Sequence, residues 1–163
     1  MEFPKRKPNR LKNYDYSQPN AYFITICTKN KETLFWEHVG ASIARPEKVC
    51  LSPYGRIVEE AISNIQTVYP AISVDNYVIM PNHIHLLLQI RTDENGRAML
   101  APTISKVIQQ MKGYVTKRIG SSIWQKLFHD HVIRDEAGYL KIWNYIEGNP
   151  SKWEEDCFYV KEG

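Results

Sequence analysis

The chain has 163 residues and a formal net charge of +3, and 43% of its residues are hydrophobic. This length favours one domain with a hydrophobic core, and the composition excludes a disordered chain. No apolar run approaches the roughly 18–20 residues of a membrane span, and neither a signal peptide nor a CxxC pair is present, so we expect a cytoplasmic protein without a membrane partner, a disulfide framework or a zinc ribbon.

The first 20 residues are polar, basic and contain three prolines. We expect them to form an arm that crosses the surface of a single domain at residues 21–163. Basic clusters can neutralise phosphates. The candidate DNA contacts in this arm are Arg6, Lys7, Arg10 and Lys12. The alternative is a solvated tail.

Seven elements are predicted along the rest of the chain, because β-branched and aromatic runs alternate with segments of helical apolar spacing. They are a strand at 22–28, a helix at 53–68, strands at 72–80 and 83–91, a helix at 102–119, a strand at 127–134 and a helix at 135–147. Only Pro81 and Asn82 separate the second and third strands, which predicts an antiparallel hairpin. The order β-α-β-β-α-β-α predicts an α+β fold, with a ferredoxin-like or RNA-recognition-motif-like antiparallel sheet and packed helices.

Two histidines, His83 and His85, begin the third predicted strand. Side chains two positions apart point the same way on a strand, so both imidazoles can converge on one metal ion. Neutral imidazole is a common ligand for divalent metals, and a third oxygen ligand with open water positions would suit Mg²⁺ or Mn²⁺ on a phosphate. The alternative is a pair of ordinary, hydrogen-bonded strand histidines. A second pair, His129 and His131, has the same spacing, so spacing alone does not decide between them.

Tyr114 lies at the edge of the apolar stripe of the second predicted helix, where a side chain can reach a solvent-filled groove. Gln110 and Arg118 share its side of the helix, and Lys112 and Lys117 lie further round towards water. A tyrosine hydroxyl beside a metal ion and basic side chains can attack a DNA phosphate and hold the product as a 5′-phosphotyrosine. The alternative is a tyrosine that closes the edge of the core.

Six segments spread over most of the chain carry a further pattern. They are RLKNYDYS (10–17), AYFITICT (21–28), VIMPNHIH (78–85), WQ (124–125), FHDHVIRDE (128–136) and YIEGNP (145–150). In this order they resemble the REP-associated tyrosine transposases, which belong with the insertion-sequence transposases of the single-tyrosine HUH type (His, hydrophobic residue, His). The resemblance implies the HUH endonuclease fold, with the histidine pair on a central strand. It also implies metal-dependent cleavage and rejoining of single-stranded DNA at hairpins formed by repeated extragenic palindromes.

Within this resemblance, His83 and His85 are the metal ligands and Tyr114 is the nucleophile. Relatives usually place Gln or Asn about one turn after the tyrosine as a further ligand. Here that position holds Arg118, which has no acceptor atom. A third ligand then comes from elsewhere, with Gln110, His131 or an acidic residue as candidates, and Arg118 contacts the DNA backbone or the tyrosine oxygen.

We therefore expect a metal-dependent single-strand DNA endonuclease and strand transferase that acts on single-stranded or hairpin DNA as a monomer or a homodimer. Beyond the arm, the candidate DNA contacts are Lys112, Lys117, Arg118, Trp124 and Arg134. Trp124 is the candidate for stacking on an unpaired base. Two alternatives remain open: a non-catalytic, domesticated nucleic-acid-binding domain of the same fold, and a nuclease that uses metal-activated water.

Overall fold

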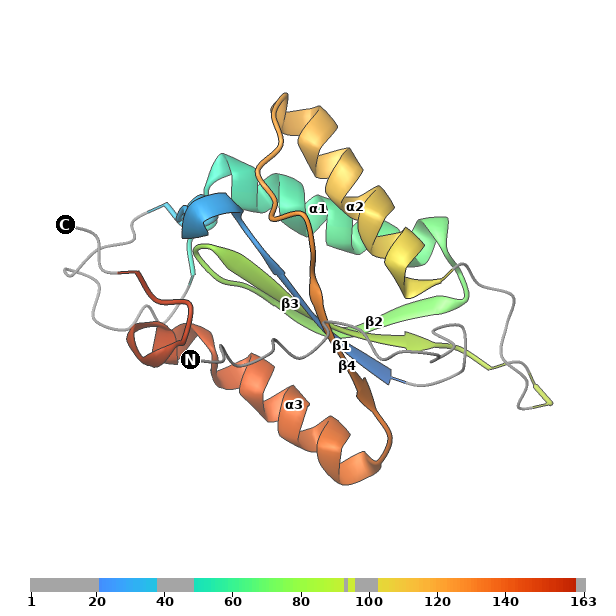
Figure 1. Cartoon of the computed structure of the whole chain (residues 1–163). Coiled ribbons are helices and arrows are strands. Elements are labelled where there is room, and N and C mark those ends of the chain that lie inside the picture. The colour runs from blue at the N-terminus through green and yellow to red at the C-terminus, as the bar shows by residue number, and fades with distance from the viewer. Residues whose placement is uncertain (1–20, 38–48, 93, 96–102, 161–163) are drawn as a thin grey trace, which may run out of the picture.

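The computed structural model describes residues 21–37, 49–92, 94–95 and 103–160 (Figure 1). The arm predicted at residues 1–20, with its candidate DNA contacts Arg6, Lys7, Arg10 and Lys12, lies outside them. The described strands and helices are β1 (Ala21–Cys27), η1 (Lys29–Lys31), α1 (Pro53–Val68), β2 (Ile72–Ile79), β3 (His83–Ile90), α2 (Ile104–Ile119), β4 (His129–Ile133), α3 (Glu136–Gly148) and η2 (Pro150–Glu155). The predicted order β-α-β-β-α-β-α is confirmed. In the described ranges, no helix has the length and apolar character needed to cross a membrane.

The four strands of the described chain form one sheet in the order β2-β3-β1-β4. Every neighbouring pair is antiparallel. This is the ferredoxin-like arrangement that the element order predicts, with the hairpin partner β3 inserted between β1 and β2. β3 and β1 are therefore the central strands, and the histidine pair lies on one of them.

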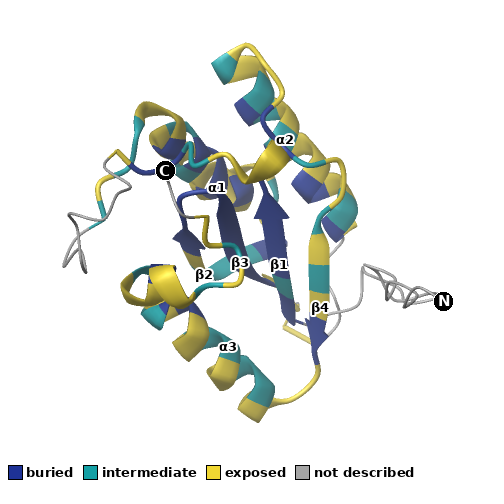
Figure 2. Ribbon diagram, turned by 60° about the vertical axis from the view of Figure 1, so that its left-hand side comes forward, coloured by how far each residue is buried: buried dark blue, intermediate teal, exposed yellow. Residues whose placement is uncertain are grey.

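The two faces of the sheet are covered by different helices: α1 and α2 lie on one side and α3 on the other (Figure 1). Tyr77 of β2 is paired with Leu86 of β3, and its hydroxyl donates to Glu59 of α1 over 3.1 Å. The face that carries Leu86 is thus the one under α1. Its buried residues on the two central strands are Tyr22, Ile24, Ile26, Ile84, Leu86, Leu88 and Ile90. Figure 2 shows these strands as the most buried part of the molecule.

Side-chain caps fix where the long helices begin. Ser52 Oγ accepts the backbone N–H of Gly55 before α1, and Thr103 Oγ1 does the same for Lys106 before α2. Such caps satisfy N–H groups that have no partner within the helix. Gly120 ends α2 in the left-handed conformation, with φ of 91°, which an L side chain rarely adopts. The predicted helix boundaries are therefore reproduced to within about two residues.

Candidate metal centre and nucleophile

The histidine pair lies on the sheet face opposite α1 and α2. His83 is paired with Cys27 and His85 with Thr25. The His83 side chain is 0% exposed and the His85 side chain 2% exposed. The Phe23 ring stacks on His85 with a centroid distance of 5.0 Å, and the Phe158 ring lies 4.5 Å from that of His83. Both imidazoles are therefore enclosed by the aromatic side chains of β1 and the C-terminal segment.

Hydrogen bonds at Nδ1 orient both imidazoles. Asn82 Nδ2 donates to the carbonyl of Phe158 over 2.8 Å, so Asn82 Oδ1 is turned to accept the Nδ1–H of His83 over 2.9 Å. Thr25 Oγ1 lies 2.8 Å from Nδ1 of His85 and can accept in the same way. The buried Nε2 atoms of both rings have no hydrogen-bond partner in the described chain. Fixing Nδ1–H in this manner leaves the Nε2 lone pair for a metal ion.

Asp156 supplies a third ligand atom. Its Oδ2 lies 3.8 Å from His83 Nε2, and one ligand atom from each of His83, His85 and Asp156 lies within 4.8 Å of the other two. Two imidazole nitrogens and a carboxylate oxygen suit a divalent cation. Of the candidates named from the sequence, His131 is not part of this group, and Gln110 lies on α2, across the sheet from it. The two imidazoles, with Asp156 as the acidic third ligand, therefore fit a divalent metal ion.

The electrostatics of this group also favour a cation. Burial lowers the pKa of His83 to about 2, and the neighbouring His85 acts in the same direction. Burial lowers the pKa of His85 to about 4 and raises that of Asp156 above its ordinary value. Both imidazoles are therefore neutral at physiological pH. A bound cation would offset the negative charge of the buried Asp156 carboxylate.

The tyrosine beside the histidine pair is Tyr145 of α3. Its ring centroid lies 5.4 Å from that of His85 and 6.1 Å from that of Phe23, and 44% of the residue is exposed. Asn149 follows four residues later, is buried, and leaves its Nδ2 without a partner in the described chain. Burial raises the pKa of Tyr145, and the Asn149 side chain opposes this shift. Tyr145 is thus followed four residues later by an amide side chain, whereas Tyr114 is followed at the same spacing by Arg118.

The structure does not bring Tyr114, the nucleophile named from the sequence, to these histidines within one chain. Tyr114 lies on α2, across the sheet from the pair, and its hydroxyl donates to Glu60 of α1 over 2.9 Å. Arg118 donates to the Tyr114 oxygen over 2.7 Å and forms an ion pair of 3.0 Å with Glu60. The contact expected between Arg118 and the tyrosine oxygen is therefore present, but it joins α2 to α1.

Two other residues predicted to contact DNA have side chains held within the protein. Trp124 is only 3% exposed and packs on Phe35, with a centroid distance of 5.5 Å, so its ring is not available to an unpaired base. Lys112 is half-buried, and its Nζ donates to the carbonyl of Gln125 over 2.8 Å; burial lowers its pKa. Its ammonium group therefore fastens the loop after α2 instead of facing DNA. Lys117 and Gln110 are exposed on α2.

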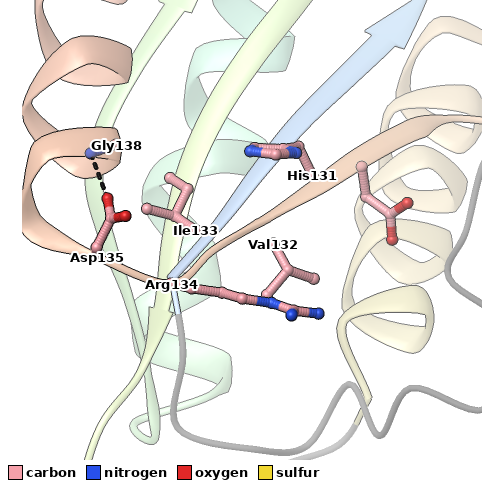
Figure 3. A pocket seen from close by; sticks show the side chains of 7 residues that line it. His131, Val132, Ile133, Arg134, Asp135 and Gly138 are labelled. Carbon is pink, nitrogen blue, oxygen red and sulfur yellow. Dashed lines mark hydrogen bonds between the residues drawn. The ribbon is translucent and has the colours of Figure 1, made fainter.

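The edge strand β4 places two further candidates near the histidine pair. His131 is paired with Phe23, which stacks on His85, and both His131 and Arg134 are exposed. They line a cavity of about 410 Å³ that extends to the first turn of α3, where Asp135 caps the helix (Figure 3). The strand β4 that lines this cavity is separated by β1 from β3, which carries His85.

Comparisons with known proteins agree with this architecture. No protein-family model matches the chain. An uncharacterised protein of Haemophilus influenzae is 36% identical over 174 residues, covering 95% of this chain and 93% of that protein. A second protein of the same organism, whose name assigns it to the REP-associated tyrosine transposases, is 26% identical over 152 residues, covering 87% of this chain and 77% of that protein.

One solved structure adds to this: that of a REP-associated tyrosine transposase bound to a REP hairpin. Its TM-score is 0.63 at 19% sequence identity, over 88% of this chain and 73% of that one. The chain is therefore similar in sequence to a protein named as a REP-associated tyrosine transposase, and it shares the fold of a solved one.

Three residues of the site were not singled out from the sequence: Tyr145, Asn149 and Asp156. A signal for the first two was present, because Tyr145 and Asn149 fall in the matching segment YIEGNP with the family's spacing of one helix turn. Asp156 has no such signal. It follows η2, and only the fold brings it to His83.

Proposed function

We propose that the protein is a metal-dependent endonuclease and strand transferase for single-stranded or hairpin DNA. In this proposal His83, His85 and Asp156 hold the metal ion, and Tyr145 is the nucleophile. The observation that carries the proposal is the convergence of two unpartnered imidazole Nε2 atoms and a buried carboxylate beside an exposed tyrosine ring. The sequence similarity to a REP-associated tyrosine transposase supports the same reaction class.

The metal, Mg²⁺ or Mn²⁺, would supply Lewis-acid polarisation of the phosphoryl oxygen. The chain's own residues prepare the site. Asn82 and Thr25 fix the imidazole tautomers, which keeps the ligand atoms directed at one point. Asn149 is a further candidate ligand through its amide oxygen, at the position where relatives place Gln or Asn.

Tyr145 Oη attacks the phosphorus of the scissile phosphodiester, and the bond from phosphorus to the 3′-oxygen breaks. The phenolic proton leaves to solvent along the exposed edge of the ring, and the departing 3′-oxygen takes a proton to become a hydroxyl. The product is a 5′-phosphotyrosine. Because one phosphodiester replaces another, attack by a new 3′-hydroxyl rejoins the strand without an energy source.

The proposed substrate is DNA with a hairpin or an unpaired strand, since a REP hairpin is bound in the solved structure of a relative. His131 and Arg134 on the edge strand β4 are candidate contacts, and the arm cations Arg6, Lys7, Arg10 and Lys12 are candidates outside the described residues. Cationic contacts to phosphates make affinity fall with salt. Lys117 and Arg118 lie on α2, so we propose them as contacts for the backbone away from the scissile phosphate.

The test is a denaturing-gel assay for a covalent protein–DNA adduct, with labelled single-stranded hairpin DNA and Mn²⁺. We expect the wild-type protein and Tyr114→Phe to form the adduct and Tyr145→Phe to form none, because only Tyr145 lies beside the histidine pair. Hairpin affinity should stay within about twofold in Tyr145→Phe, since the variant loses one oxygen atom.

Other outcomes would contradict the proposal in distinguishable ways. An adduct that disappears in Tyr114→Phe would reassign the nucleophile. Cleavage to free 5′-phosphate ends without an adduct would mean metal-activated water. Tight hairpin binding without cleavage would mean a non-catalytic binding domain.

A further inference from the structure

α3 carries the proposed nucleophile and has one fully buried residue in the described chain, Ile146. Tyr139, Ile142 and Trp143 pack against the core but are only partly buried. Leu140 is 52% exposed, although a helix that packs on a sheet normally buries such a side chain. Polar contacts to the sheet therefore add to the apolar ones in setting the position of Tyr145.

A β-bulge in β2 provides them. Val74 is paired with Leu88 and Asn76 with Leu87, so Asp75 is an extra residue with no partner position on β3. A bulge changes which face the following side chains point to. Asn76 shares the α3 side of the sheet with Leu87, and Tyr77 points to α1, where it donates to Glu59.

Two polar contacts run from the bulge to α3. The Tyr139 hydroxyl donates to Asp75 Oδ2 over 2.6 Å, and Asn76 Nδ2 donates to Glu147 Oε1 over 3.0 Å. Tyr139 comes six residues before Tyr145, and Glu147 comes two residues after it. The contacts thus fix α3 on both sides of the nucleophile.

The bulge side chains are themselves held in place. Ser73 Oγ donates to Asp75 Oδ1 over 2.7 Å, and the backbone N–H of Tyr77 donates to Asn76 Oδ1 over 2.9 Å. Each side chain therefore meets α3 with its rotamer already set by β2. Burial and the Asp75 contact raise the pKa of Tyr139 to about 12, so this hydroxyl stays a donor across the physiological range.

We propose that the β2 bulge positions Tyr145: Asp75 and Asn76 hold α3 through Tyr139 and Glu147, so that the Tyr145 ring stays against His85. Resting on the proposed function, this makes Asp75, Asn76, Tyr139 and Glu147 positioning residues for strand cleavage. A displacement of about 1 Å at a reacting group can cost about a hundredfold in rate. Two tethers on one helix restrict both its sliding and its rotation over the sheet.

The first test compares two variants that each remove one hydroxyl from a tyrosine–carboxylate contact involving β2. Tyr139→Phe breaks the contact to α3, and the matched control Tyr77→Phe breaks the contact to α1 on the opposite face. At saturating hairpin DNA, we expect the single-turnover cleavage rate of Tyr139→Phe to fall about tenfold with an unchanged Kd. Tyr77→Phe should keep its rate within about twofold. Equal rates in the two variants would overturn the proposal.

The second test uses the acceptor. Asp75→Ala removes it, whereas Asp75→Asn keeps an oxygen that can accept the Tyr139 hydroxyl. We expect Asp75→Asn to restore most of the rate that Asp75→Ala loses, and Tyr139→Phe combined with Asp75→Ala to be no slower than either alone. Additive losses would mean that the two residues act separately, contrary to the proposal.

A third test does not depend on cleavage. With 3-fluorotyrosine at position 145, ¹⁹F NMR of the metal-free protein reports the surroundings of that ring. We expect one narrow resonance in the otherwise wild-type protein and in Tyr77→Phe, and a shifted or broadened one in Tyr139→Phe. Identical spectra in all three would overturn the positioning role even if wild-type protein cleaves DNA. Loss of the proposed function alone would appear as a wild-type protein that forms no adduct while the resonance still responds to Tyr139→Phe.

Discussion

The sequence pattern does not indicate that Asp156 is a candidate metal ligand, whereas its position beside His83 and His85 in the structure does. Its side chain is 2% exposed and lies on the segment after η2, where the backbone carbonyl of Phe158 is bonded to Asn82. Asn82 therefore holds both the His83 imidazole and the segment that carries Asp156. The histidines alone could be predicted from the strand pattern, because alternation puts both on one face.

Asp156→Asn should weaken Mn²⁺ binding by at least about tenfold, because it removes an anionic ligand and keeps the side-chain volume. Isothermal titration of the DNA-free protein measures this. The matched control is Glu154→Gln, which neutralises an exposed carboxylate two residues earlier on the same segment. If both variants bound Mn²⁺ as the wild type does, Asp156 would not be a ligand.

The positions of the helices explain why Tyr114 is misleading. Right-handed crossovers carry α1 from β1 to β2 and α2 from β3 to β4, which puts both helices on the same face of the sheet. The aliphatic side of β3, with Ile84 and Leu86, packs under them, so the histidines face away from α2. Element order and strand alternation together show which helices face the histidines. Helical periodicity alone does not, because it places both Tyr114 and Tyr145 outside the buried face of their helices.

The bulge in β2 marks the limit of what could be predicted for the elements. The sequence pattern predicts a strand at residues 72–80, and the structure has one at Ile72–Ile79. One extra residue, Asp75, changes the register and moves Asn76 to the α3 side. Register depends on pairing with β3 and on the contacts of α3, so a periodicity of two along a single strand does not show it.

At the scale of the whole molecule, the site depends on a chain fold that brings together the start of β3, the last turns of α3 and the segment beyond η2. That residues 21–163 form a single domain remains our proposal. The fold encloses both imidazoles so fully that their protonation is linked to folding.

The free energy of unfolding should fall as the pH drops below about 6.5. The unfolded histidines bind protons there, whereas burial keeps the folded pKa of His85 near 4 and that of His83 near 2. Stability is thus full above the unfolded pKa and decreases towards the folded values, by about 2 kcal/mol for each histidine between pH 7 and 5. The raised pKa of Asp156 acts in the opposite direction, so a comparison of variants isolates the histidine effect.

Urea unfolding in the presence of a chelator measures this effect. His85→Gln should reduce the pH dependence between pH 7 and 5 by about half, since His83 remains, whereas His131→Gln, at an exposed position on β4, should leave it unchanged. The same slope in His85→Gln and the wild type would show that the imidazole is not buried in its neutral form.

The most direct test of the central claim is to identify the residue linked to DNA in the wild-type protein. After reaction with hairpin DNA and Mn²⁺, nuclease trimming and proteolysis, mass spectrometry locates the phosphonucleotide on a peptide. We predict that it lies on Tyr145, on the peptide that contains Trp143 and Asn149. A phosphonucleotide on Tyr114, or on no tyrosine at all although cleavage occurred, would contradict the account.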